Sequence, residues 1–418
     1  MRKIYNINEL EYLILFIFLF LQSILSEVSL IFSYSDELFA CWGLWKFIQQ
    51  PIRSRIWNEY PGVMKIIRLA LFVVIVGWAG TIVNRIQPSL NSNLMDCFTL
   101  LKIFLIFFLS VNLLRKCNFN RIIETIYGIT SIYILSGFIF LILSQFIDVG
   151  MSFEKRFGFN DFKFINPNPG DYSSILIISL VIFHISSFYM KKTLLLMKAI
   201  TLILILFTFR GKSIGFIATY LMVVFFINRY NKISRKSLFI LAFLGILGGY
   251  FQIRYYFLDN VTPRALFLVN GITTANDFFP LGAGYSTFGS NMAKINYSPL
   301  YGKYGFDQVW GMNQEEQQFL NDNFWPMIMG QYGWIGLLLY VDILLLLFKI
   351  INIEIVNKQL KIAGFSIFFL LLYSSVGGPI FVHYIGCASI IVFSLILKGN
   401  NSNIIHSVES FKRLNSYV

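Results

Sequence analysis

The chain has 418 residues, 56% of them hydrophobic and 13% charged, and a formal net charge of +13 at pH 7. Soluble domains are about 45–50% apolar, so this composition excludes an ordinary soluble enzyme. It predicts an all-α integral membrane protein, because a bilayer core about 30 Å thick requires long apolar helices. Most Lys and Arg lie between apolar runs, which indicates membrane orientation and excludes a nucleic-acid partner.

Apolar runs recur along the whole chain, and we expect a single polytopic domain, residues 1–418, of about 12 transmembrane helices. The runs lie near residues 10–25, 28–48, 66–84, 94–114, 122–147, 171–190, 193–209, 213–228, 237–253, 324–348, 362–376 and 379–397. The second run is the weakest because it carries Asp36 and Glu37, and without it the number is 11. The first run lacks a cleavage signature, so we interpret it as an uncleaved span, with a signal peptide as the alternative.

The distribution of charge predicts the orientation of these helices. If both termini are cytoplasmic, most Lys and Arg fall in the inner segments, as the positive-inside rule requires. Two loops then face outward: a shorter one at 148–170 and a long one at 254–322, between spans nine and ten. A few basic residues oppose the rule on the outer side, where the alternative role of each is to bind lipid phosphates or helix carboxyl ends. They are Arg156, Arg210, Lys212 and Arg264.

The long loop 254–322 contains four basic residues, six acidic residues and fourteen aromatic residues. Such a mixture suits sugars, because aromatic faces pack against pyranose rings while polar groups bond hydroxyls. We expect Tyr285, Tyr301 and Trp310 to contact sugar, with an interfacial aromatic belt as the alternative. The stretch Gly282–Gly284 predicts a close backbone turn beside an acceptor groove, or else a simple bend.

Sequence signatures of nucleotide-driven and metal-dependent enzymes are absent. No P-loop, GxGxxG, HExxH or GxSxG motif occurs, and we expect no cofactor and no metal site. His184 lies in an apolar run and is predicted to be a core histidine, whereas His383, after the Gly377–Pro379 break, is a candidate for an outer site. The four cysteines lack CxxC spacing and indicate neither zinc nor a disulfide framework.

Four stretches between about residues 150 and 350 form a pattern. They are RFGFNDFKFINPNPGDYSS from Arg156, TFRGKSIGFIATYL with Arg210, Arg264 followed by PLGAGYSTFG, and DNFWPMIMGQYGWIGLLLY after Asn321. In this order and topology they resemble the O-antigen polymerase and ligase family, the Wzy-type membrane glycan polymerases.

The resemblance implies glycosyl transfer at the outer face of the bacterial inner (plasma) membrane. The donor would be a polyprenyl-diphosphate-linked oligosaccharide, and a polymerase would move the growing glycan to the non-reducing end of another lipid-linked repeat unit. Membrane lipids, a flippase and a chain-length regulator are the further expected partners. A transporter of lipid-linked oligosaccharide and an O-antigen ligase are the alternatives.

The resemblance also implies roles for individual residues. Arg210 and Arg264 would be catalytic and bind the diphosphate, together with Arg156 and Lys212, because a guanidinium fork matches phosphate oxygens. The ligase branch of the family has a His before Asn at the entry to the late span, where this chain has Asp322. That difference disfavours a ligase and makes Asp322 the candidate general base. Glu315 and Glu316 compete for this role, and helix capping is the alternative for Asp322.

Overall fold

The computed structural model describes residues 5–50, 56–152, 154–156, 158–234, 236–241, 243, 245, 254 and 262–415. Helices dominate this part of the chain, and its two strands, β1 (Lys155–Arg156) and β2 (Phe159–Asn160), form one short antiparallel pair. The predicted all-α class is therefore confirmed for the residues described.

Eight helices in the described ranges are long and apolar enough to cross a membrane, so the architecture is that of a multi-pass membrane protein. They are α5 (Pro61–Asn84), α6 (Leu90–Arg115), α7 (Phe119–Phe146), α8 (Pro169–Met190), α10 (Gly211–Tyr230), α15 (Phe324–Lys349, continued by η4, Ile350–Glu354), α16 (Lys358–Gly377) and α17 (Tyr384–Asn415).

Three of the four other predicted spans, the first, second and seventh, differ from full-length helices. The first is a pair, α1 (Ile7–Phe20) and α2 (Gln22–Val28), bent by 75°. The second becomes η1 (Leu30–Tyr34) and α3 (Ser35–Ile48), and the seventh becomes α9 (Leu195–Phe207). At 1.5 Å per residue α3 and α9 reach only about 20 Å, and most of the run at 237–253 lies outside the described residues. Twelve spans are therefore not confirmed.

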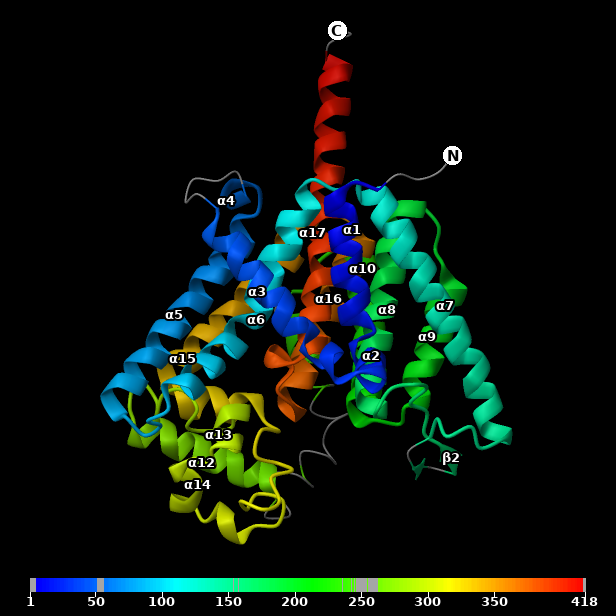
Figure 1. The fold of residues 1–418 in the computed structure, drawn as a ribbon. Helices are drawn as coiled ribbons and strands as arrows, with labels where there is room; N and C mark the ends of the chain where they lie inside the picture. The colour runs from blue at the N-terminus through cyan, green and yellow to red at the C-terminus, as the bar shows by residue number, and fades with distance from the viewer. Residues whose placement is uncertain are drawn as a thin grey trace.

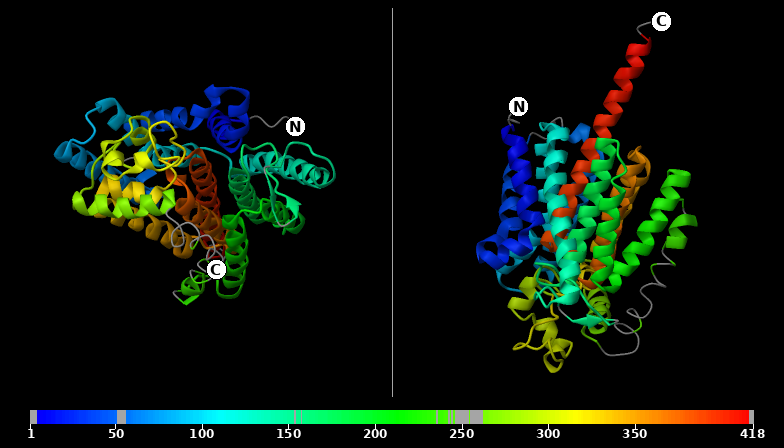
Figure 2. Two further views of the ribbon diagram at one scale, coloured as in Figure 1. Left: turned by 90° about the horizontal axis from the view of Figure 1, so that it is seen from below. Right: turned by 90° about the vertical axis from the view of Figure 1, so that its right-hand side faces the viewer.

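The start of α1 and the end of α17 lie at one end of the helix bundle, as Figure 1 shows. The opposite end carries β2 and a group of short helices that we call the cap, residues 262–322. The short helices are α12 (Pro263–Asp277), α13 (Asn291–Ile295), α14 (Pro299–Lys303) and η3 (Phe306–Gln308). Figure 2 shows the cap covering one side of that end. Two further small elements in the described ranges are α4 (Ile56–Glu59) and η5 (Ile380–Val382).

The cap is a folded unit with a hydrophobic core of its own. Phe267 of α12 packs edge to face on Phe288, with ring centroids 5.2 Å apart, and Tyr301 stacks on Phe306 at 5.5 Å. Burial of these rings stabilises the unit, because each aromatic side chain removes a large apolar area from water. Many of the aromatic residues predicted as a loop surface are thus core residues.

One buried carboxylate and two glycines attach the cap to the bundle. Asp96 of α6 accepts hydrogen bonds from the Ser286 backbone N–H at 2.7 Å and from Gln331 Nε2 at 2.9 Å. Gly282, at φ 77°, passes so close to Gly333 that a side chain at either position would meet the other's backbone. The close turn expected at Gly282 is present, and it packs against α15, where Gly333 (φ 61°) breaks the helix.

Candidate functional site

Three segments of the chain meet where the cap joins the bundle. We call the residues that meet there, Arg264, Asp322 and Gly377, the junction site. Arg264 follows Pro263 in the first turn of α12, and its Nε and Nη2 donate to Asp322 Oδ2 at 3.1 and 2.9 Å. Nη2 also donates to the Gly377 carbonyl, at the end of α16, at 3.3 Å. Residues far apart in sequence thereby hold one guanidinium in a defined orientation.

Asp322 lies just before α15 and keeps 32% of its side chain exposed. Burial of the remainder raises the pKa of this carboxyl above its ordinary value, and the charge and hydrogen bonds of Arg264 only partly offset that rise. A carboxylate with a raised pKa is a stronger proton acceptor than an ordinary one. Asp322 therefore has the properties of a general base beside a fixed cation.

Asn323, which the sequence analysis did not choose as a site residue, has an unusual environment. It occupies the N-cap of α15 without making a side-chain cap bond, and Pro326, three residues later, has no N–H to offer. The side chain is only 3% exposed, and neither its amide nitrogen nor its oxygen has a hydrogen-bond partner among the described residues. A buried amide without partners is costly, which marks it as a group that a bound polar molecule could satisfy.

A second arginine, Arg210, lies near two acidic residues, Glu154 and Asp161. We call this group of three the turn site. Arg210 begins α10, with Nη1 3.7 Å from Glu154 Oε1 and Nη2 3.6 Å from the buried Asp161 Oδ2. The backbone fixes this arrangement, because the Phe162 N–H donates to the Phe207 carbonyl at 2.9 Å. The loop predicted at 148–170 is thus folded onto the α9–α10 turn.

Lys212 lies against α8, where its Nζ donates to Ser174 Oγ at 3.0 Å. The same end of α8 is capped by Asn168, which accepts from the Asp171 N–H at 2.9 Å. The structure therefore brings Lys212 to a helix start that could receive an anion. The backbone of Arg156 lies in β1, and its side chain lies outside the described part.

His383, the candidate for an outer site, ends the η5 turn that follows Gly377. It is half-buried, and burial lowers the pKa of its imidazole below the ordinary value. Its ring lies against the Tyr384 ring, with centroids 4.4 Å apart.

The predicted sugar-contacting residues require a correction. Tyr285 and Tyr301 are fully buried: Tyr285 packs between Trp78 and Tyr332, and the Tyr301 hydroxyl accepts from the Gly289 N–H at 3.0 Å. Close packing against small residues explains this, because Gly77 of α5 leaves room for the Tyr285 ring. We therefore withdraw both tyrosines as sugar contacts.

Trp310, at 64% exposed, stays available to a ligand. Glu315 and Glu316 lie in an exposed turn whose backbone N–H groups donate to Asn313 Oδ1. The two glutamates are therefore surface residues, whereas the Asp322 carboxylate is paired with Arg264. Asp322 therefore remains the candidate base.

His184 is a core histidine, as predicted. Its Nδ1 is 2.7 Å from Gln359 Oε1 and its Nε2 is 2.8 Å from the Tyr220 hydroxyl, so both ring nitrogens are used inside the bundle. Within the residues that the structure describes, no group of three or more His, Cys, Asp or Glu is arranged to hold a metal ion. The four cysteines are free, and only Cys41 is exposed.

The bundle also contains a buried ionic cluster. Lys102 of α6 forms ion pairs with Asp36 and, at 2.7 Å, with Glu37 in the first turn of α3, while Gln22 Nε2 donates to Asp36 Oδ1 at 2.8 Å. These pairs explain how a run with two acids is accommodated among apolar helices, since buried charges must be paired.

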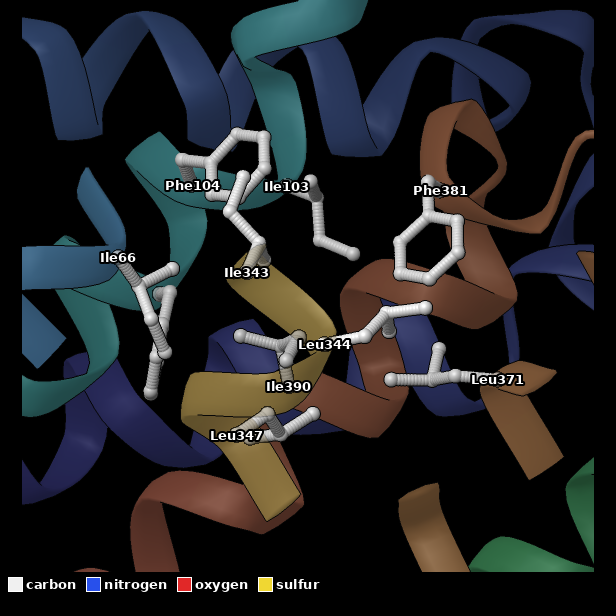
Figure 3. Close-up of a pocket in the computed structure, with 10 residues that line it drawn as sticks. Ile66, Ile103, Phe104, Ile343, Leu344, Leu347, Leu371, Phe381 and Ile390 are labelled. Atoms are coloured by element: carbon white, nitrogen blue, oxygen red, sulfur yellow. The ribbon is translucent and has the colours of Figure 1, made fainter. Parts of the chain in front are cut away.

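A cavity near the centre of the bundle is apolar throughout, as Figure 3 shows. Ile103, Leu344 and Phe381 are among its lining side chains, which come from α6, α15 and the η5 turn. Phe381 also packs against Phe324 at the start of α15, with ring centroids 4.7 Å apart and the rings tilted by 42°. The cavity lining has no group for proton or phosphate chemistry.

No model of a protein family matches this chain, and no curated protein sequence matches it.

Proposed function

We propose that the protein is a membrane glycosyltransferase that polymerises lipid-linked oligosaccharide repeat units at the end of the bundle that carries the cap. The observation that carries the proposal is the junction site, where Arg264 is held against Asp322, a carboxyl with a raised pKa. Charge stabilisation and proton removal are the two requirements of transfer from a diphosphate donor. The resemblance of the motifs supports the same conclusion.

In the proposed reaction the donor is a glycan on polyprenyl diphosphate and the acceptor is a hydroxyl at the non-reducing end of another lipid-linked unit. Asp322 accepts the proton of this hydroxyl as its oxygen bonds to the donor's anomeric carbon. The bond from that carbon to the diphosphate oxygen breaks, and the diphosphate leaves with the electron pair. Arg264, with Arg210 and Lys212, stabilises the leaving charge. No nucleotide is consumed.

Because Arg264 is paired with Asp322, the donor would have to bind before Asp322 can act as the base. A diphosphate carries more charge than one carboxylate, so it competes with Asp322 for Arg264. Once the guanidinium turns to phosphate, the Asp322 oxygen becomes available to the acceptor hydroxyl. The unsatisfied amide of Asn323, next in the chain, would hold a neighbouring hydroxyl as both donor and acceptor. Binding of the donor would therefore activate the base.

A test in cells compares Arg264→Ala with Lys294→Ala, a matched loss of one cap cation outside the junction site. After equal insertion is verified, glycan is resolved on gels as a ladder of lengths. We expect Arg264→Ala to leave single repeat units at the outer leaflet and Lys294→Ala to give the full ladder. A full ladder from Arg264→Ala would contradict the proposal.

A transporter of lipid-linked oligosaccharide is the second candidate, and the buried ionic cluster favours it. Ionisable residues inside a membrane bundle often mark a substrate or ion pathway. Lys102→Met combined with Asp36→Asn and Glu37→Gln removes the charges while keeping the side-chain sizes similar. Accumulation of repeat units on the inner leaflet in that variant would favour transport, whereas normal ladders would favour a structural role. A ligase has no comparable observation in its favour.

A further inference from the structure

The helix α12 has an exposed apolar face that the cap core does not cover. Residues 265–276 contain no charged side chain, and Phe267, their one aromatic residue, is part of the cap core. On the opposite face Val269 is 61% exposed and Ile272 is 36% exposed. Phe279, just after the helix, is 71% exposed. An apolar stripe of this kind on a surface helix requires a partner.

The orientation of α12 matches a helix that lies in a membrane interface. In Figure 1 it runs across the long axis of the bundle, at the end where α5 finishes and α15 begins. Gly271 of α12 lies directly against Pro326 of α15, and Asn276 accepts from Trp334 Nε1 at 2.9 Å. The helix is thus fixed sideways against the start of a spanning helix.

The apolar stripe is continuous with the exposed apolar surface of a spanning helix. On α15, Leu338, Val341 and Leu345 are exposed at helical spacing, as expected of side chains that face lipid. The Ile335 N–H contacts the Pro280 carbonyl, which places Phe279 beside the lower end of that row. One apolar surface therefore runs from α15 through Phe279 onto α12.

Cationic side chains border this surface where lipid phosphates would lie. Arg85, at the end of α5, is exposed, and the Asn84 side chain beside it donates to the Gly282 carbonyl at 2.9 Å, next to Phe279. Lys303 pairs with Asp277 at the end of α12, at 2.7 Å, and lies over the Tyr304 ring. Basic residues at the edge of an apolar helix face match the anionic headgroups of a bilayer.

We propose that α12 is an interfacial helix, with Val269, Ile272 and Phe279 seated at the boundary between headgroups and acyl chains of the leaflet that α15 enters. The consequence concerns Arg264, in the first turn of the same helix. It is held at the depth of the lipid phosphates, where the diphosphate of a membrane-anchored donor also lies. The donor then reaches the junction site by diffusing sideways in the leaflet. Only this last step rests on the proposed function.

The test uses the full-length protein in vesicles of equal parts phosphatidylcholine and phosphatidylglycerol. In a Cys41→Ser background, a bimane fluorophore is attached to Ile272→Cys, to Leu338→Cys on α15, or to Glu315→Cys on the exposed turn of the cap. Quenching is then measured with lipids brominated on their acyl chains and, separately, with aqueous iodide. No activity is measured, so failure here and failure of the proposed function are distinguishable.

We expect bromolipid to quench bimane at position 272 at least about twofold, nearly as it quenches at 338, because the interface reaches the acyl chains. Iodide should quench at 315 and have little effect at 272. Strong iodide quenching at 272 would overturn the proposal, because the face would then be in water. Protection of position 272 from both quenchers would also overturn it, because protein, such as a second copy, would then cover the face.

Discussion

The junction site and the turn site each hold an arginine against acidic groups at the same end of the bundle, but they do so differently. Arg264 makes hydrogen bonds of 2.9 and 3.1 Å to one oxygen of a carboxylate that is partly exposed. Arg210 lies 3.6 and 3.7 Å from two carboxylates, one of them fully buried. The contacts of Arg264 are therefore shorter and its carboxylate is accessible to solvent, whereas the contacts of Arg210 are longer and involve two carboxylates.

The difference indicates that the two arginines have different roles, a more structural one for Arg210 and a more chemical one for Arg264. A buried carboxylate such as Asp161 needs a cation to offset its desolvation, so Arg210 has a structural task in addition to any contact with substrate. Asp322 retains contact with solvent and does not need Arg264 to the same degree. We therefore expect Arg264 to be released to a diphosphate more readily than Arg210, and the chemistry to depend more on the junction site.

Asp322→Asn should have the largest effect on transfer, because it removes the proposed base while preserving size. We expect a loss of roughly 10²-fold to 10⁴-fold in the rate of chain growth, the usual contribution of a general base. The matched control is Glu315→Gln, which should change little. Equal losses from the two substitutions would show that the junction site is not special.

The remaining activity should also depend on pH through Asp322. Its pKa is raised by burial, and the base works only when deprotonated, so the rate should fall as pH decreases through a value above that of an ordinary aspartate. In Asp322→Asn this acid limb should vanish. A limb that persists unchanged in the variant would assign it to another group, such as His383.

Arg264→Ala should lower transfer by about 10²-fold to 10³-fold, the cost of removing one charge-stabilising donor. Arg264→Lys should recover only part of the rate, since an ammonium keeps the charge but loses the planar fork. Full recovery by lysine would indicate that charge alone matters at the junction site. Rates are compared at equal amounts of inserted protein.

Arg210→Ala should have a smaller effect on chemistry, about tenfold, the equivalent of one charged hydrogen bond. Its larger effect should be on stability, because the buried Asp161 carboxylate loses the nearby Arg210 cation and keeps the Glu154 N–H as a hydrogen-bond donor. Arg210→Ala with Asp161→Asn should therefore restore the melting temperature but not the rate. If the double variant recovered both the melting temperature and the rate, the turn site would be purely structural. If it recovered neither, the different roles assigned to Arg210 and Arg264 would be contradicted.

Asp96→Asn should have the smallest effect, through the position of the cap. The substitution replaces a carboxylate that accepts from Ser286 and Gln331 with an amide, at a cost of about 1–3 kcal/mol in stability. Protease sensitivity of the cap should rise before that of the bundle. An unchanged cap would show that the junction site is positioned by other contacts.

The sequence predicted the class of fold well and its spans less well. Long apolar runs identify helices such as α6 and α8, because the bilayer requires their length. The run with Asp36 and Glu37 was ambiguous, since its outcome depends on Lys102, which lies more than sixty residues away. The partner of a buried charge cannot be seen from local composition.

The site was predictable only in part. Arg264 and Asp322 were chosen separately, from motif position, and their contact depends on the packing of α12 against α15. Asn323 was overlooked, although Pro326 three residues later is a local signal that its side chain cannot cap the helix in the usual way. The aromatic count of the loop misled, because composition does not reveal which rings a small core will bury, as for Tyr285 and Tyr301.

The most direct measurement is chain growth by the purified protein in vesicles with a lipid-linked repeat unit and no nucleotide. We predict products of increasing length on the lipid diphosphate, formed by the native protein and by Lys294→Ala but strongly reduced in Asp322→Asn and Arg264→Ala. Transfer of unextended units across the bilayer, with no longer product, would contradict glycosyl transfer and favour transport.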